Sequence, residues 1–144
     1  MFQNKSRRTF IYDNKEDRWT TGPSLLTARH YHSSCAIQSD EGSTLFIIII
    51  GGETDQQHFS KSTEILNLKD QKWAQGPQLP CGIRFATCVA LPPSTNFACV
   101  IVGGQSEEDN YSSKVYALNK IMSEWTVLGN ITTGRYSHIA IPIS

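Results

Sequence analysis

The stretch Leu45-Phe46-Ile47-Ile48-Ile49-Ile50-Gly51-Gly52 decides the fold of this chain. Its six consecutive apolar residues predict a β-strand covered on both faces, because a strand with one wet face would alternate with polar residues. Four isoleucines in a row are stiff at χ1 and favour a pleated sheet over a helix. The glycine pair is expected to end the strand where the backbone turns or approaches a neighbour closely.

The same pattern returns 52 positions later, in the apolar run 97–102 followed by Gly103-Gly104. Three further markers recur at nearly the same spacing. They are the tryptophans Trp19, Trp73 and Trp125, an apolar residue seven positions before each (Tyr12, Leu66, Leu118), and an arginine ten or eleven positions after each (Arg29, Arg84, Arg135). Such regularity predicts a repeat of about 50 residues.

Each repeat is expected to hold four short antiparallel strands separated by polar turns and Gly-Pro breaks. The predicted strands are residues 9–12, 18–21, 29–37, 45–50, 63–68, 72–74, 84–91, 97–102, 114–118, 124–128 and 136–141. One segment also fits a helix, since Val115, Leu118, Ile121, Met122 and Trp125 would share one helical face. The equivalent segment before Trp19 has turn chemistry instead, and this favours strand, turn and strand.

A double glycine after the second strand and a tryptophan in the fourth, at this period, resemble the kelch repeat. The Tyr12-Asp13 to Trp19 segment is most similar to it, whereas leucines replace the tyrosine in the two full units. The resemblance implies an all-β kelch-type β-propeller fragment of about 2.75 four-stranded antiparallel blades, a ring that this chain alone does not close. The expected parts are an N-terminal tail (1–8), a half blade (9–21), two complete blades (28–75 and 83–128) and the first strand of a further blade (135–143).

Composition excludes several classes of function. Thirteen basic residues balance thirteen acidic ones, so the basic footprint of a nucleic-acid-binding protein is missing. Six apolar residues cannot span a bilayer, so no membrane partner is expected. The four cysteines show neither a disulfide framework nor paired zinc spacing. The polar start of the chain is not typical of a signal peptide, and this favours the cytoplasm as the expected location, while three glycosylation sequons leave an extracellular location open.

The strand order predicts where a partner would bind. In an up-and-down sheet, loops 53–60 and 105–112 leave at the same end as the loops that lead into the repeated arginines. Arginines at such a mouth can bind carboxylates through bidentate bonds. The candidate partner-binding residues are Arg29, Arg84, Arg135, Glu53, Gln105 and Glu107. The alternative is that the arginines bond backbone carbonyls and tie adjacent loops together.

No metal or cofactor is expected from the sequence. His30 and His32 could share a strand face, and His138 follows Arg135 as His32 follows Arg29, but no carboxylate or thiolate accompanies them. Cys88 and Cys99 could face each other across a hairpin and are expected to be buried free thiols. Neither a nucleophile elbow, a zinc-protease motif nor a phosphate-binding glycine loop occurs.

The favoured function is therefore recognition of a protein or peptide without catalysis, with further propeller blades as a second kind of partner. By resemblance, many kelch domains are substrate receptors of cullin ubiquitin ligases, joined to a BTB domain, or organise actin. Two alternatives stay open. One is a fragment of a kelch-type enzyme, similar to a galactose-oxidase-like copper enzyme or a sialic-acid epimerase, and the other is a non-functional truncated reading frame.

Overall fold

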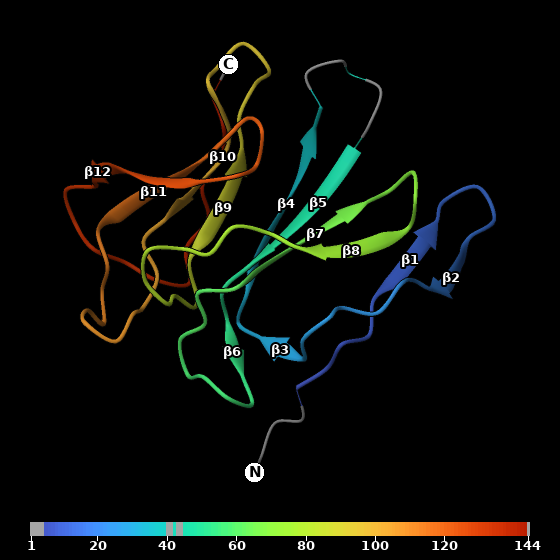
Figure 1. Ribbon diagram of the computed structural model, residues 1–144, viewed down its shortest axis with the longest axis horizontal. Helices are drawn as coiled ribbons and strands as arrows, with labels where there is room; N and C mark the ends of the chain where they lie inside the picture. Colours follow the sequence, from blue (N-terminus) through green and yellow to red (C-terminus); the bar gives the residue numbers. More distant parts are fainter. Residues whose placement is uncertain (1–4, 40–41, 43–44, 144) are drawn as a thin grey trace.

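The computed structural model describes residues 5–39, 42 and 45–143, and these residues form an all-β structure without a helix (Figure 1). The strands are β1 (Phe10–Asp13), β2 (Arg18–Thr21), β3 (Arg29–His30), β4 (Ser33–Gln38), β5 (Leu45–Ile50), β6 (Glu53–Thr54), β7 (Thr63–Asn67), β8 (Lys72–Gln75), β9 (Thr87–Ala90), β10 (Phe97–Val102), β11 (Lys114–Asn119) and β12 (Trp125–Asn130). The first four residues of the expected N-terminal tail lie outside the described part.

Two four-stranded antiparallel sheets dominate, with the strand orders β4-β5-β7-β8 and β9-β10-β11-β12. The edge strands β4 and β9 pack against each other, so that the sheets meet near the centre of Figure 1. The β1–β2 hairpin and β12 lie towards opposite sides of the molecule, and β3 pairs with β6 at a third site. The predicted repeat of four antiparallel strands is confirmed for both complete units.

The isoleucine strand is buried as its sequence predicts. Ile48, Ile49 and Ile50 are 0%, 8% and 1% exposed, and because successive residues point to opposite faces, both faces of β5 are covered. Leu45, at the start of the strand, is exposed. The core extends from β5 across to the second sheet, where Ile101, Tyr116 and Leu118 are also buried.

The double glycines end β5 and β10 with the same geometry. Gly51 and Gly52 have φ values of 64° and 90°, and Gly103 and Gly104 have 64° and 98°. A Cβ on Gly51 would lie 2.3 Å from the carbonyl oxygen of Ile83, and one on Gly103 would lie 2.4 Å from that of Arg135. Both the left-handed backbone and the close approach therefore require glycine.

The tryptophans connect successive units. Trp73 Nε1 donates to the carbonyl oxygen of Pro23 at 2.8 Å, and Trp125 Nε1 donates to that of Pro77 at 3.1 Å. Trp19 is 69% exposed. The segment with helical spacing forms the strands β11 and β12 with a turn between them, and Ile121 in that turn is exposed, so the strand prediction is confirmed.

Three strand predictions are wrong. The strand expected over 29–37 is broken after His30, and the one expected over 84–91 begins only at Thr87. Tyr31 and Phe85 have φ values of 58° and 55°, and a left-handed residue interrupts the pleat. Residues 136–141 form no strand: Ser137 has a φ of 51°, and these residues form no ladder with a described strand.

The described part of the chain contains no helix with the length and apolar character needed to cross a bilayer.

Candidate partner-binding face

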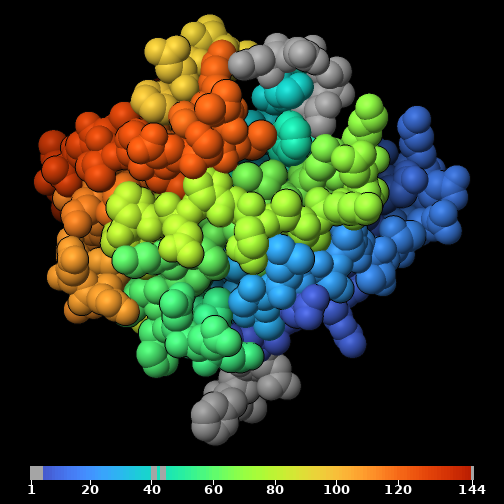
Figure 2. Space-filling model, viewed as in Figure 1, coloured from blue at the N-terminus to red at the C-terminus, as the bar shows by residue number. Residues whose placement is uncertain are grey.

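The loops predicted to gather at one end do so. Arg84 forms an antiparallel bridge with Gln105, and His30 pairs with Glu53 between β3 and β6. Figure 2 shows residues 53–60 (green) and 105–112 (orange) next to each other at the lower left of the molecule. The turns before β4 and β9 and the loops after β5 and β10 therefore lie at one end of the sheets.

Arg84 is held in place at this end by contacts on several sides. Its Nη1 lies 2.7 Å from Glu53 Oε2, and its Nε donates to Gln105 Oε1 at 3.3 Å. The guanidinium carbon lies 4.7 Å from the ring centroid of Phe59 and 5.3 Å from that of Phe85. Stacked and paired in this way, the guanidinium loses little further conformational freedom when a ligand binds. The side chain remains 24% exposed, so a partner can reach it.

Glu53 is surrounded by basic side chains. Lys5 Nζ, His30 Nε2 and His58 Nδ1 lie 3.4, 3.5 and 3.5 Å from its Oε1, while Arg84 binds the other oxygen. Burial raises the pKa of Glu53, but the hydrogen bond and charge of Lys5 and the charges of the two histidines outweigh this and lower the pKa below its usual value. Several basic side chains therefore converge on one carboxylate at this surface.

The lowered pKa of Glu53 predicts an acid-sensitive contribution to stability. A group whose pKa is lower in the folded than in the unfolded protein stabilises the fold above its unfolded pKa, here near 4.5, and loses that effect as the pH falls through the folded pKa. The difference in unfolding free energy between the wild type and Glu53→Gln should therefore shrink as the pH falls from about 6 to about 3. Urea titrations at several pH values measure it; a constant difference would contradict the assignment.

A row of aromatic rings lies beside Arg84. The ring centroids of His30 and Tyr31 are 4.1 Å apart, those of Tyr31 and Phe85 4.2 Å, those of Phe85 and Tyr136 6.0 Å, and those of Tyr136 and Tyr111 5.3 Å. We call these five rings the aromatic face. Tyr31, Tyr111 and Tyr136 are exposed, so the row presents aromatic surface to solvent.

Backbone strain coincides with this row. Tyr31, Phe85 and Ser137 are all left-handed, a conformation that bulky residues rarely adopt. The N–H of Phe85 donates to the carbonyl of Tyr31, and the N–H of Ser137 donates to that of Phe85, so one chain of hydrogen bonds connects the three units. These bonds stabilise the strained positions, two of which are aromatic, while the third, Ser137, directly follows Tyr136. The sequence prediction missed the aromatic residues, although an aromatic residue follows Arg84 and Arg135 directly and Arg29 two positions later.

The three repeated arginines do not occupy one position, and that expectation is wrong for Arg84. If the left-handed residues are aligned, Arg29 corresponds to Ile83 and Arg135, and Arg84 corresponds to His30 and Tyr136. The backbone agrees, because Gly52 N donates to the carbonyl of Ile83 and Gly104 N donates to that of Arg135. Arg84 is displaced by one residue and points to the surface.

Arg29 is not available to a partner, and its place among the partner-binding candidates is corrected here. Its side chain is fully buried, with Nη2 2.6 Å from Glu64 Oε1 and Nη1 donating to the carbonyl of Gly51 at 2.7 Å. Arg29 therefore follows the alternative prediction, in which the arginine bonds backbone carbonyls and has an architectural role. Arg135 is exposed and donates to the carbonyl of Thr133, Gln105 is half-buried against Arg84, and Glu107 is exposed.

The histidines and cysteines that the sequence singled out lie in separate parts of the fold. Tyr31 turns the chain between His30 and His32, so these two histidines do not lie on one continuous strand. His138 is half-buried, and neither of its ring nitrogens has a hydrogen-bond partner. Cys88 pairs with Ile101 and Cys99 with Ala90, so the two cysteines are diagonal neighbours rather than direct cross-strand partners. All four cysteines are free thiols.

Comparison with known proteins adds no family to this geometry: no protein-family model matches the chain, and no curated protein matches it with significant similarity.

Proposed function

We propose that this chain recognises a protein or peptide through the aromatic face and Arg84, as a segment of a kelch-type β-propeller. The observation that carries the proposal is the row of five neighbouring rings next to an arginine already fixed by Glu53 and Phe59. Tyrosine and arginine, together with tryptophan, are enriched among the residues that dominate binding energy at protein interfaces. Rings held at fixed positions also lose little entropy on binding.

The propeller part of the proposal is supported by three features that recur from one unit to the next. The double glycines approach the following unit in the same way, and Trp73 and Trp125 donate to the Gly-Pro segment of the preceding unit. A left-handed residue also lies two positions before β4 and before β9. Such nearest-neighbour contacts between equivalent sheets are the means by which propeller blades are held together.

Further blades are the second proposed partner. Apolar side chains are exposed at both ends of the described chain: Phe10, Ile11, Tyr12 and Trp19 on the first hairpin, and Val127, Leu128, Ile139 and Ile141 near the last strand. Each such side chain gains roughly 1.5–3 kcal/mol when it is fully buried. By analogy with kelch domains, the parent assembly would be a substrate adaptor of a ubiquitin ligase or an actin-binding protein in the cytoplasm.

The proposal predicts that substitutions in this face weaken binding more than stability. A random peptide library is selected on the immobilised chain, and the affinity of an enriched peptide is then measured for variants. Arg84→Ala and Tyr136→Ala should each weaken binding by about tenfold or more, equivalent to about 1.4 kcal/mol. Arg84→Ala should lower the unfolding free energy by only about 1 kcal/mol or less, because the Arg84–Glu53 pair is partly exposed.

A matched control is Tyr12→Ala, which removes an exposed tyrosine from the first hairpin and should leave the affinity unchanged. If Arg84→Ala bound the peptide normally but melted at a much lower temperature, Arg84 would be architectural. If both face variants bound normally, or if no peptide were enriched, the proposed function would be wrong.

A further inference from the structure

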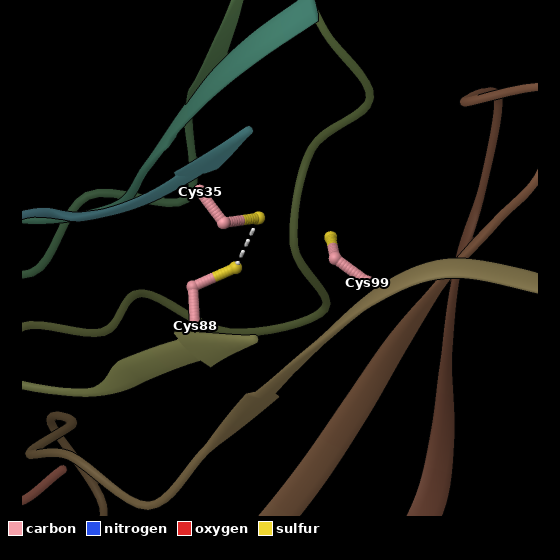
Figure 3. Close-up of side chains that lie close together, drawn as sticks. All are labelled: Cys35, Cys88 and Cys99. Atoms are coloured by element: carbon pink, nitrogen blue, oxygen red, sulfur yellow. Dashed lines mark hydrogen bonds between the residues drawn. The ribbon is translucent and has the colours of Figure 1, made fainter. Parts of the chain in front are cut away.

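Three cysteines come together where the two sheets meet. Cys35 lies on β4 of the first sheet, and Cys88 and Cys99 lie on β9 and β10 of the second. Figure 3 shows their side chains pointing towards one another across the junction. The three Sγ atoms all lie within 4.8 Å of one another, and Cys88 donates to Cys35 at 2.9 Å.

The surroundings of this three-sulfur cluster are apolar. Cys99 is fully buried, Cys35 and Cys88 are half-buried, and all three border the hydrophobic core. Their strand neighbours Ile48, opposite Cys35, and Ile101, opposite Cys88, are both 0% exposed. Across residues 5–39, 42 and 45–143, this is the only group of three or more histidine, cysteine or acidic side chains whose ligand atoms converge closely enough to hold a metal.

The three thiols also shift one another's pKa values. Hydrogen bonds from Cys88 and Cys99 lower the pKa of Cys35 to about 5, although burial opposes this. The pKa values of Cys88 and Cys99 are raised, mainly through their interactions with Cys35. The thiolate is the form of cysteine that binds metals.

We propose that Cys35, Cys88 and Cys99 form a three-coordinate binding site for one copper(I) ion. Soft thiolate ligands select copper(I), zinc or iron–sulfur clusters. Zinc in closed sites takes four protein ligands, and the described residues supply three here. Copper(I) accepts three sulfurs in a plane. A metal–sulfur bond of about 2.3 Å places three such sulfurs about 4 Å apart, within the range that these sulfurs already span.

Binding involves no change of oxidation state. Each cysteine bonds to the ion as a thiolate, and a cysteine that is protonated loses its thiol proton to solvent as it bonds to copper, so binding releases protons. The affinity should consequently rise with pH. Because the ligands come from both sheets, the bound ion also connects the first repeat to the second and should raise the melting temperature.

The test uses the whole chain, reduced with a phosphine and kept anaerobic. Copper(I) is titrated in competition with bathocuproine disulfonate. The wild type should bind one ion per chain, and Cys35→Ser, Cys88→Ser and Cys99→Ser should each weaken binding by at least roughly tenfold, the loss that even outer-shell partners of metal ligands show. Cys81→Ser is the matched control, because Cys81 contacts Tyr116 outside the cluster, and it should bind copper as the wild type does.

Copper K-edge X-ray absorption of the loaded wild type provides a readout that does not depend on the folding of any variant. Three sulfur neighbours are expected. Two sulfurs, or sulfur mixed with nitrogen or oxygen, would overturn the site, as would equal copper binding by all four serine variants. Zinc is titrated in parallel, and a zinc ion that stoichiometric copper(I) could not displace would overturn the assignment to copper.

Discussion

Glu64→Gln should lower the free energy of unfolding by about 3–5 kcal/mol, because it leaves a buried guanidinium without its counter-charge. Both side chains of the Arg29–Glu64 pair are completely buried, and Nη2 lies 2.6 Å from Oε1. The carboxylate also accepts hydrogen bonds from the backbone N–H groups of Leu26 and Thr27, at 2.7 and 3.0 Å. The amide keeps the shape of glutamate but offers one acceptor oxygen and no charge. Urea denaturation measures the loss.

The matched control is Glu53→Gln, which removes the partly exposed pair with Arg84 and should cost about 1 kcal/mol or less at neutral pH. A loss as small for Glu64→Gln as for this control would show that the buried charge of Arg29 is compensated elsewhere. Glu53→Gln is expected to disturb only the loops around Glu53, whereas Glu64→Gln should lower the free energy of global unfolding.

The second repeat shows what can replace this pair. Ile83 stands where Arg29 would be, and Tyr116, 52 residues after Glu64, fills the place of the carboxylate and contacts Cys81 at 2.9 Å between Oη and Sγ. A buried ion pair has thus been exchanged for a mostly apolar set in an equivalent sheet. The double variant Arg29→Ile with Glu64→Tyr should therefore recover most of the stability that either single change loses, since well-packed apolar groups can replace a buried ion pair without net cost.

This exchange also explains what the sequence could not predict. Apolar runs, double glycines and tryptophans indicate burial and backbone geometry directly from the residue type. They were therefore sufficient to predict two four-stranded sheets. An arginine ten or eleven residues after a tryptophan does not report which residue faces the core. Ile83 occupies the buried position in the second repeat, so Arg84 was wrongly aligned with Arg29. The offset of one residue is visible only in the structure, from the left-handed residues Tyr31 and Phe85.

The binding candidates were predictable to different degrees for a similar reason. The convergence of Glu53, Arg84 and Gln105 follows from strand order alone. The aromatic face does not, because left-handed tyrosine and phenylalanine leave no residue signature of the kind that glycine provides. The three-sulfur cluster joins residues 53 and 64 positions apart, and its existence depends on how β4 packs against β9 and β10. Short-range zinc spacings cannot detect a site of this kind.

Trp125→Ala should lower the free energy of unfolding by about 3–5 kcal/mol, the usual cost of truncating a buried tryptophan and leaving a cavity. Trp125 is 5% exposed, borders the core and donates Nε1–H to the carbonyl of Pro77 in the preceding unit. Trp19 holds the equivalent position in the first hairpin but is 69% exposed, so Trp19→Ala should change stability by no more than about 0.5 kcal/mol. Trp73, half-buried and bonded to Pro23, should fall between them.

This order of effects tests the contact between repeats, because the three tryptophans share one sequence position and differ in how much of the preceding unit covers them. Trp125→Phe separates the two contributions of the residue: it keeps most of the apolar area, loses the bond to Pro77, and should cost less than the alanine variant. Chemical denaturation of the four variants gives the comparison. Equal losses for Trp19→Ala and Trp125→Ala would mean that the first hairpin is covered as fully as the last strand, and that burial between neighbouring repeats does not set the energetics of this fold.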